Sequence, residues 1–519
     1  MNSWETEWFE RRSRMTPDKT AVVDGRTGMN WSYRQLQERT ERLAMALRQW
    51  GIKKGDRVAL LAPNGLYYFE LLFACARTGA VLVPMNWRLS PVELAYILED
   101  CSYKLVFYHE ELEALANSVE PGLRISLQSE SYANAGEEGM IGTTVQATAQ
   151  YQALAAKEPL LMIYTGGTTG KPKGVVLSHR SVYANASNTV LSWGLTDQDV
   201  TITYLPMFHT GGINALSLPV LLAGGTVVVE REFEPERAVM LLVSACCSVV
   251  LMVPTMYHLL VQTESFYHAQ FPHMRSFISG GAPCPLTIYD AFADKGLPFK
   301  EGYGMTEAGP NNFYLTPADA ARKRGSVGRP MICNRIRIMN EQGIEAAAGE
   351  VGEIQISGQH LFEAYWNNPQ ATADACSDGW FHTGDLGRRD DEGFYFIVGR
   401  KKEMIITGGE NVYPLEVEHL LQQHPAVAEA AVIGLPHAKW GELVTAVITL
   451  RHGSHVTGEE LQAYCALQIG KYKVPKKILF VATLPKTPVG KIDKNSLVTA
   501  FSEQGLDGDH LNNKQIVSE

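Results

Sequence analysis

The pattern of hydrophobic and polar residues changes about two thirds of the way along the 519-residue chain. Before about residue 330, short apolar runs alternate with segments of helical pattern, an order typical of parallel β-α-β units. We predict a helix at residues 67–77 and strands at 56–62, 80–84, 105–108, 160–164, 201–205, 226–229, 248–253 and 276–279. This part of the chain is therefore expected to form a large α/β domain with parallel sheets.

Beyond about residue 330 the apolar runs become short, alternating and separated by turns, at residues 336–339, 352–356 and 393–398. Such alternation is typical of antiparallel strands and predicts a small β-barrel-like unit attached to the first domain. A dense charged run, Gly399–Glu403 (GRKKE), follows. After it the chain restarts as helix, strand, strand and helix, at residues 414–424, 427–435, 444–450 and 459–467.

This restart predicts a domain boundary, and the fold class is a multidomain α/β protein. We assign residues 1–399 to an N-terminal domain, 400–403 to a hinge and 404–519 to a small, mobile α+β domain. The C-terminal piece is long enough to fold alone. The total length supports this division, because a single hydrophobic core rarely serves so many residues.

Composition narrows the classes of partner. The formal net charge of −10 argues against nucleic acid as the main partner, because that partner needs basic surface. Eight cysteines show neither a CxxC pair nor zinc-ligand spacing, so we expect reduced thiols that pack as small apolar groups. The sequence leaves a monomer and a homodimer open.

Neither a leader nor a membrane span is predicted. The N-terminus has charges of both signs and no apolar signal core. The most apolar stretch, Ala238–Val253, ends at Pro254 and falls short of the ~20 residues that a span needs. It is better explained as a buried helix leading into a buried strand, and we expect a cytoplasmic protein.

The segment Leu160–Gly174 reads LLMIYTGGTTGKPKG, an apolar strand followed by a loop rich in glycine and threonine. Glycines let backbone N–H groups approach an anion, threonine hydroxyls donate further hydrogen bonds, and Lys171 and Lys173 add positive charge. The alternative is a flexible loop without a ligand. A Walker A loop is excluded, because Pro172 follows Lys171 where serine or threonine is required.

The loop from Tyr164 to Gly174 resembles that of the adenylate-forming superfamily of acyl-CoA synthetases, peptide-synthetase adenylation domains and luciferases. One position departs from the family pattern, since Gly166 stands where serine is usual, and this change loosens ATP contacts without abolishing them. The resemblance implies ATP-binding roles for Thr165, Gly166, Gly167, Thr168, Thr169, Gly170 and Lys173.

A second motif, Glu301–Gly309 (EGYGMTEAG), matches the same family. A tyrosine between glycines offers a flat face for adenine, a threonine can donate to a phosphate, and a carboxylate can hold Mg²⁺. The resemblance implies catalytic roles for Thr306 and Glu307, with Glu307 as the metal ligand. It adds Gly302, Tyr303, Gly304 and Met305 to the ATP site, together with Gly281 and Ala282 of the upstream segment SGGAP.

Two further motifs follow in the family's order. Phe381–Gly387 (FHTGDLG) contains Asp385, the residue that matches the family's ribose-binding carboxylate. Arg400 matches a second ribose and phosphate contact, and Lys402 falls at the position of the family's hinge. Either motif alone would be only a turn, so their order and spacing carry the argument.

The predicted C-terminal domain supplies groups for both halves of a two-step reaction. Lys491, in PKTPVGKIDK, matches the family's catalytic lysine, whose ammonium reaches the α-phosphate and the substrate carboxylate as charge builds. Gly408, Gly409 and Asn411, in GGEN, resemble the loop that borders the CoA pantetheine. The family's reaction uses ATP, Mg²⁺ and coenzyme A to convert an acid through an acyl-adenylate into a thioester.

The acid is only partly specified. Leu205–Gly212 (LPMFHTGG) lacks the aspartate that amino-acid-activating relatives carry there, which disfavours an α-amino acid. His209 resembles a group beside the substrate carboxylate, so the resemblance implies a catalytic role for it. His209 is also expected to line the acyl site with Gly281, Gly304 and Asn311. We predict a medium- to long-chain fatty acid. Alternatives are an aryl acid, a carrier-protein thiol in place of CoA, or a non-catalytic nucleotide-binding protein.

Overall fold

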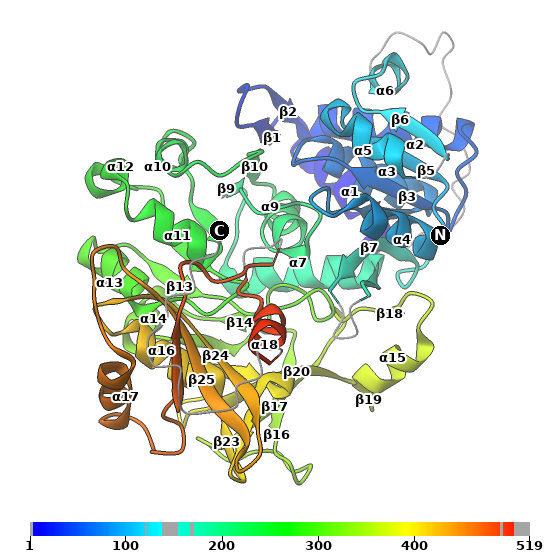
Figure 1. Ribbon diagram of the computed structural model, residues 1–519. Coiled ribbons are helices and arrows are strands. Elements are labelled where there is room, and N and C mark those ends of the chain that lie inside the picture. Colours follow the sequence, from blue (N-terminus) through cyan, green and yellow to red (C-terminus); the bar gives the residue numbers. More distant parts are fainter. Residues whose placement is uncertain (1–3, 120–121, 137–153, 167–170, 488–490, 503–519) are drawn as a thin grey trace.

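The structure, a computed structural model, describes residues 4–119, 122–136, 154–166, 171–487 and 491–502. Its first layer is a seven-stranded sheet in the order β18-β8-β7-β4-β3-β5-β6 (Figure 1). The strands are β3 (Arg57–Leu61), β4 (Val81–Pro84), β5 (Leu105–Tyr108), β6 (Leu123–Ser126), β7 (Pro159–Thr165), β8 (Lys173–Ser178) and β18 (Ala364–Tyr365). The five strands from β7 to β6 are parallel, as the alternating pattern predicts.

Two strands at one edge of this sheet, β8 and β18, run antiparallel to their neighbours, which the sequence analysis did not anticipate. The reason is the short connection between β7 and β8, because a parallel return needs a crossover of a dozen or more residues. The phosphate loop predicted from the sequence therefore joins two antiparallel strands, which pair up to Thr165 and Lys173.

Helices surround the parallel part of the sheet. The predicted helix at 67–77 is α3 (Tyr67–Thr78), which is buried on nearly all sides and packs against α2 (Tyr33–Gln49). Ser32 begins α2 with a reciprocal capping box to Gln35. The other helices of this region are η1 (Trp4–Thr6), α1 (Trp8–Met15), α4 (Pro91–Cys101), η2 (Glu110–Leu112), α5 (Glu113–Ser118), α6 (Glu130–Gly136) and α7 (His179–Trp193).

Two smaller sheets lie beside the first. One has the order β2-β1-β10-β9, with β1 (Thr20–Asp24), β2 (Asn30–Ser32), β9 (Val200–Thr203) and β10 (Thr226–Val229). The other is parallel, with the order β11 (Val249–Met252), β12 (Ser276–Ser279) and β13 (Phe299–Glu301). Their helices are α8 (Thr210–Ile213), α9 (Ser217–Ala223), α10 (Pro235–Ser244), α11 (Pro254–Leu260), α12 (Glu264–His268), α13 (Leu286–Asp294) and α14 (Pro317–Arg322).

The apolar stretch at 238–253 is a helix, α10, leading into a buried strand, β11, as predicted. None of the helices in the described ranges is long and apolar enough to cross a membrane. All eight cysteines are free, but Cys246 and Cys333 are exposed, so the expectation that the thiols pack as apolar groups is wrong for these two. Cys246 follows α10 and Cys333 follows β15 (Ser326–Pro330), so both lie in connections between elements rather than within a buried strand or helix.

The antiparallel unit forms a seven-stranded half-barrel. Six strands follow the order β14-β15-β21-β20-β17-β16, and β19 pairs with β20. Their bounds are β14 (Phe313–Tyr314), β15 (Ser326–Pro330), β16 (Arg335–Met339), β17 (Val351–Ser357), β19 (Cys376–Ser377), β20 (Trp380–Arg389) and β21 (Tyr395–Arg400). Helix α15 (Pro369–Ala375) lies between β18 and β19.

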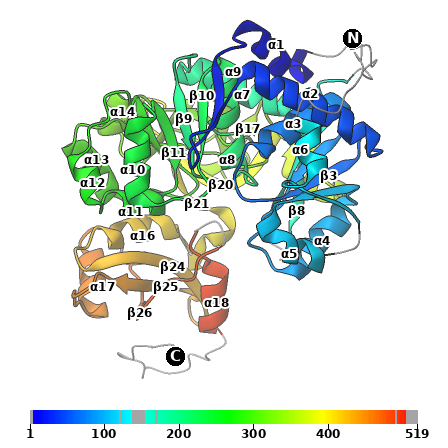
Figure 2. The same cartoon turned by 90° about the horizontal axis from the view of Figure 1, so that it is seen from above.

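The remaining elements form a separate layer with its own core. The sheet order is β23-β22-β25-β24, with β26 parallel to β25. The elements are η3 (Lys401–Glu403), β22 (Ile405–Thr407), β23 (Glu410–Val412), α16 (Pro414–Gln422), β24 (Val427–His437), β25 (Gly441–Leu450), α17 (Gly458–Ala466), β26 (Lys477–Phe480) and α18 (Lys494–Ser502). Two hydrophobic clusters contain only residues from 405 onward. Figures 1 and 2 show this layer beside the larger part of the molecule. The multidomain α/β class is confirmed, while the boundaries at 399 and 403 and the mobility of the C-terminal layer stay predictions.

Candidate active site

The site begins where two parallel strands end at one edge of a sheet. Gly281 follows β12 and Gly302 follows β13, and the backbone N–H of Gly302 donates to Ser279 O at 2.8 Å. Crevices outside the carboxyl ends of parallel strands are common ligand sites in α/β proteins. Gly281 has a φ of +84°, a conformation that glycine adopts without strain. The predicted ATP residues Gly281, Ala282 and Gly302 therefore lie on one rim.

The loop after β13 folds tightly on itself. A Cβ on Gly304 would lie 2.2 Å from the carbonyl carbon of Pro310, so only glycine fits there. The backbone N–H of Met305 donates to Gly309 O, and that of Asn312 donates to Tyr303 O. Thr306 is buried within this loop. The loop thus holds the predicted residues Tyr303 to Glu307 in one fixed conformation.

A chain of buried amides fixes the end of this loop. Asn312 donates to Ala308 O and Gly309 O, and its own Oδ1 lies 3.0 Å from Asn334 Nδ2 and 3.1 Å from His360 Nε2. Burial lowers the pKa of His360 to about 4, so this imidazole is neutral. A fully paired polar network of this kind is rigid, and it pre-organises the loop.

Asp385 joins the loop to the half-barrel. The Tyr303 hydroxyl donates to Asp385 Oδ2 at 2.6 Å, and Arg400 Nε lies 2.6 Å from Oδ1. Asp385 and Arg400 are partners in the register of β20 and β21, so their side chains meet across the sheet. Burial raises the pKa of Asp385, whereas Arg400 and the Tyr303 hydrogen bond oppose this effect. The structure thus brings together Tyr303, Asp385 and Arg400, three of the residues that the motifs assigned to the nucleotide.

Glu307 is linked to the hairpin that carries the phosphate loop. The Tyr365 hydroxyl donates to Glu307 Oε1 at 2.9 Å, and the Lys173 ammonium lies 5.1 Å from the centre of the Tyr365 ring. Thr165 and Lys173 pair across β7 and β8 at the base of the loop. The other loop residues assigned from the sequence, Gly167, Thr168, Thr169 and Gly170, lie outside the described residues.

Gly166 is exposed, and a Cβ added there would meet no described atom within 4 Å. The described residues would therefore leave room for the usual serine at this position.

Glu307 could contribute to a metal site together with ligands from a nucleotide. Within the described ranges no three His, Cys, Asp or Glu residues form a metal-binding group. Mg²⁺ is commonly held by one or two carboxylates plus substrate phosphates, so a single carboxylate beside a phosphate loop fits this ion. Burial raises the pKa of Glu307, an effect that a bound cation would reverse.

Lys491 reaches this cleft from the C-terminal layer. Desolvation by the surrounding protein and the charge of Arg400 lower the pKa of Lys491, and Asp385 and Glu403 oppose this only in part. Lys491 itself is exposed to solvent. Burial, together with the charges of Lys491 and Arg88, lowers the pKa of His209 to about 4.

His209 Nε2 is buried without a hydrogen-bond partner among the described residues. A neutral imidazole with an unused ring nitrogen is suited to contact a carboxylate or acyl group. Of the other residues assigned to the acid, Gly281 and Gly304 lie on the loops described above. Asn311 is buried and donates to Thr189 Oγ1 and Ala215 O, so both of its N–H groups are used internally. The side-chain oxygen alone is left for the predicted acyl contact.

The predicted CoA loop is a tight hairpin on the C-terminal layer. Gly408 and Gly409 have positive φ angles of 61° and 87° and join β22 to β23. Two such residues in succession form the turn that matches the twist of a two-residue hairpin. Asn411 Nδ2 donates to Glu341 Oε1 at 3.3 Å, so this hairpin lies against the turn after β16. Lys491, from the same layer, acts instead through its charge on His209.

The predicted hinge residue Lys402 is exposed within the short helix η3. Its neighbour Glu403 lies 3.3 Å from Lys494 Nζ, which also pairs with Glu418 of α16 at 2.7 Å. The segment that carries Lys491 is thus tied to the segment that joins the two layers.

Three residues of the site were missed by sequence reasoning. Arg88 follows β4 and lies over the Phe208 ring, Tyr365 touches Glu307, and Asn64 holds the segment before His209 through Leu205 O and Met207 N. Arg88 and Asn64 contact residues more than a hundred positions away along the sequence, and Tyr365 contacts Glu307 across 58 positions. An apolar strand ending in a polar residue was the only local signal for Asn64.

Comparisons with known proteins agree with this geometry. The model of the AMP-binding enzyme family matches residues 9–366, and that of the AMP-binding enzyme C-terminal domain matches residues 416–491. A feruloyl-CoA synthase of Amycolatopsis sp is 37% identical over 494 residues, covering 95% of this chain and 98% of the relative. The long-chain-fatty-acid–CoA ligase FadD13 of Mycobacterium tuberculosis is 35% identical over 508 residues, covering 95% and 98%.

Among solved structures, ATP-bound MatB from Rhodopseudomonas palustris is 33% identical with a TM-score of 0.88, covering 97% of this chain and all of that one. Each relative is matched over nearly its full length, and both family models match in the order found in the chain. The chain belongs to the AMP-binding enzyme family, in the acyl-CoA ligase branch of AMP-forming acid–thiol ligases.

Proposed function

We propose that this protein activates an apolar monocarboxylic acid with ATP and transfers the acyl group to coenzyme A. The observation that carries the proposal is the buried Asp385, which pairs with Arg400 and Tyr303 and is also influenced by the charge of Lys491 from the C-terminal layer. In the first step a carboxylate oxygen attacks the α-phosphorus and pyrophosphate leaves. In the second step the CoA thiol attacks the acyl carbonyl, and AMP leaves with the bonding electrons.

The first step brings together several negative groups, and the chain's residues offset them. Lys491 and Arg400 supply positive charge at the ribose and α-phosphate, while Lys173 does so at the phosphate loop. Tyr303 stacks adenine, and the ionised Asp385 accepts hydrogen bonds from the ribose hydroxyls. Thr306 donates to a phosphate. Bound Mg²⁺, held by Glu307, would neutralise phosphate charge.

The remaining assigned groups serve the nucleotide through their backbone. Thr165, Gly166, Gly167, Thr168, Thr169 and Gly170 cradle the phosphates, and Gly281, Ala282, Gly302, Gly304 and Met305 line the adenine. These residues leave room for close approach because most lack a bulky side chain.

The second step uses a different face of the C-terminal layer. Lys491 and the Gly408–Asn411 hairpin belong to one layer, but the charge of Lys491 acts on His209 while Asn411 contacts Glu341. Both cannot occupy the cleft in a single arrangement. We assign the change to rotation about residues 400–403, with Lys402 as the hinge, which withdraws Lys491 and brings Gly408, Gly409 and Asn411 to the pantetheine.

The acid is proposed to be a fatty acid of medium to long chain. His209 contacts its carboxylate, Gly281, Gly304 and Asn311 contribute to the acyl site, and the LPMFHTGG segment offers no carboxylate for an ammonium. An aryl acid is the second candidate, because the 37% identical relative is a feruloyl-CoA synthase while the fatty-acid relative is 35% identical.

ATP–pyrophosphate exchange tests the proposal across hexanoate, dodecanoate, palmitate, benzoate, cinnamate, ferulate and succinate, each repeated with CoA and thioester detection. We expect exchange with dodecanoate or palmitate and thioester only when CoA is present. Preference for cinnamate or ferulate would select the aryl alternative. Exchange without thioester would indicate a carrier-protein acceptor, and no exchange with any acid would favour a non-catalytic nucleotide-binding protein.

A further inference from the structure

A small cavity lies behind the strand that leads into the nucleotide motif. Its volume is about 120 Å³, and it is lined by Trp193, Val249, Arg275, Ser276, Lys300 and Tyr314, among others. Ser276 is the first residue of β12, whereas Gly281 follows the carboxyl end of that strand. The cavity and the nucleotide site are therefore at opposite ends of β12.

Lys300 points into this cavity because of the alternation along β13. Its neighbours Phe299 and Glu301 face Tyr289, which contacts the Phe299 ring and donates to Glu301 Oε1. Lys300 must then face the opposite side of the strand. There its ammonium lies 4.2 Å from the centre of the Trp193 ring and 5.1 Å from that of Tyr314.

Lys300 is a buried lysine without a carboxylate partner among the described residues. It is only 5% exposed, and no carboxylate in the described part of the chain lies within ion-pair distance of its ammonium. Buried lysines are almost always paired, since an isolated charge is expensive to remove from water. Aromatic rings attract a cation but do not neutralise it.

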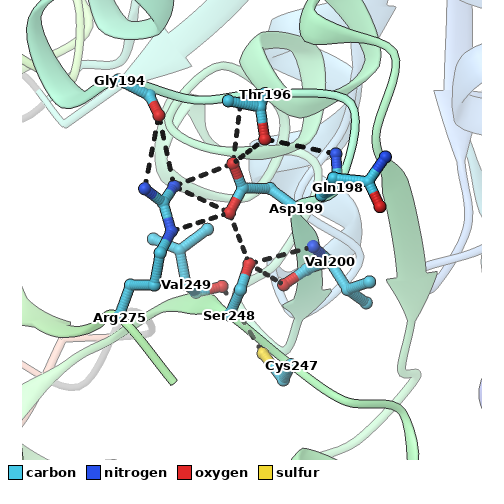
Figure 3. Close-up of polar contacts among 9 residues, drawn as sticks. All are labelled: Gly194, Thr196, Gln198, Asp199, Val200, Cys247, Ser248, Val249 and Arg275. Atoms are coloured by element: carbon cyan, nitrogen blue, oxygen red, sulfur yellow. Dashed lines mark hydrogen bonds and ion pairs between the residues drawn. The ribbon is translucent and has the colours of Figure 1, made fainter. Parts of the chain in front are cut away.

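The other cation of the cavity, Arg275, is already compensated. Arg275 Nη2 lies 2.7 and 2.8 Å from the two oxygens of Asp199, and the guanidinium also donates to Gly194 O (Figure 3). Asp199 in turn accepts from Ser248 Oγ and from the Thr196 backbone N–H (Figure 3). Asp199 thus has its oxygens occupied and serves Arg275, which leaves the charge of Lys300 uncompensated.

A second polar group of the cavity also has no partner. Ser276 Oγ is buried and forms no hydrogen bond with the described residues. A hydroxyl that can donate, beside an ammonium and next to a paired guanidinium, is an arrangement suited to an anion. The volume has room for about four waters at ~30 Å³ each, which is enough for a small inorganic anion but not for a nucleotide.

We propose that the cavity formed by Lys300, Ser276, Trp193 and Tyr314 is a binding site for a small inorganic anion, such as chloride or sulfate. The anion pairs with the Lys300 ammonium and accepts a hydrogen bond from Ser276 Oγ. Because Lys300 immediately precedes Glu301, the bound anion stabilises β13 where it enters the nucleotide loop.

Protonation gives the site a defined pH dependence. Burial, and to a smaller extent the nearby Arg275, lower the pKa of Lys300 to about 7, while Asp199 faces Arg275 and Trp193 and Ser276 carry no charge. An anion binds the protonated lysine, so binding is tighter below this pKa than above it and takes up a proton.

The test is the thermal unfolding midpoint of the whole chain in chloride, sulfate or gluconate at constant ionic strength, about one pH unit below and above the pKa of Lys300. Gluconate is the control anion because it is too large for the cavity. We expect chloride or sulfate to raise Tm by about 2 °C or more at the lower pH, and by less at the higher pH. The anion that produces the larger shift identifies the preferred ligand.

Lys300→Met should abolish the anion-dependent shift, and Ser276→Ala should reduce it while disturbing the fold least. Lys104→Met, at an exposed lysine, is the matched control and should keep the full shift. An equal shift in the wild type, Ser276→Ala and Lys300→Met would overturn the proposal. So would the absence of any difference between chloride, sulfate and gluconate in the wild type.

Discussion

Replacing Tyr303 by phenylalanine should shift the acid side of the pH profile of kcat/KM for ATP to higher pH. Tyr303 donates to Asp385 Oδ2 at 2.6 Å, and Asp385 must be ionised to accept hydrogen bonds from ribose. Burial already raises the pKa of this carboxyl, and the Tyr303 hydrogen bond opposes the rise. Loss of the hydroxyl therefore raises the pKa again, and ATP affinity falls sooner as the pH decreases.

The magnitude follows from the type of bond. A hydrogen bond to a charged group contributes about 1.5–3 kcal/mol, and we take the lower end of this range because Arg400 remains paired with Asp385 in the variant. One pKa unit corresponds to about 1.4 kcal/mol, so we expect a shift of about one pH unit and a roughly tenfold increase in KM for ATP on the acid side of this profile.

The assay is ATP–pyrophosphate exchange, with kcat/KM for ATP measured across the acid range. Tyr395→Phe is the matched control, because the Tyr395 hydroxyl donates to Ile336 O in the same half-barrel without touching Asp385. The control should leave the acid side of the profile in place. If Tyr303→Phe has the wild-type pH profile and the wild-type KM for ATP, the proposed role of the Tyr303–Asp385 pair is wrong.

Three further predictions concern other parts of the site. Gly166→Ser should fold normally and lower KM for ATP by about threefold, because no described atom would clash and one hydroxyl is gained. An unchanged KM for ATP in pyrophosphate exchange would show that this hydroxyl does not contact the phosphates. Lys494→Met leaves Glu403 and Glu418 without their shared cation and should slow adenylation. The control, Lys473→Met, removes the ion pair with Glu416 on the same helix, and the Lys494 variant should be at least tenfold slower than this control. Equal rates would argue against a role of Lys494 in positioning the Lys491 segment. The pKa of His209 is lowered from 6.5 to about 4, so between these pH values the unfolded state binds more protons than the folded state, and the free energy of unfolding decreases as the pH drops. Denaturant unfolding of His209→Asn should show a smaller decrease over this pH range. Identical pH profiles for the variant and the wild type would contradict the burial of a neutral imidazole.

The alternating pattern predicted most of the strands, because a buried strand in an α/β domain is a local apolar run. The predicted strand at 105–108 coincides with β5, and the predicted helix at 414–424 is α16, Pro414–Gln422. The antiparallel edge was not predicted, because β18 pairs with β8 across nearly two hundred residues. Such a pairing leaves no periodic trace in either short segment.

The same limit applies to the site. Motifs found Asp385, Glu307 and Lys491, since each lies within a short run of characteristic residues. Arg88 had no such context, because its importance comes from its place beside Phe208 and His209. Asn311 shows the reverse, since its position in a motif region did not reveal that both of its N–H groups are engaged by Thr189 and Ala215.

The central claim is that Lys491 acts in adenylation and leaves the cleft before thioester formation. It is tested most directly by measuring the two half-reactions separately in Lys491→Ala, with Lys471→Ala, at an exposed lysine of the same layer, as the control. We predict that pyrophosphate exchange falls by about a thousandfold or more, whereas CoA thioester formation from supplied acyl-AMP stays near the wild-type rate. Equal loss of both half-reactions, or retention of both, would contradict the account.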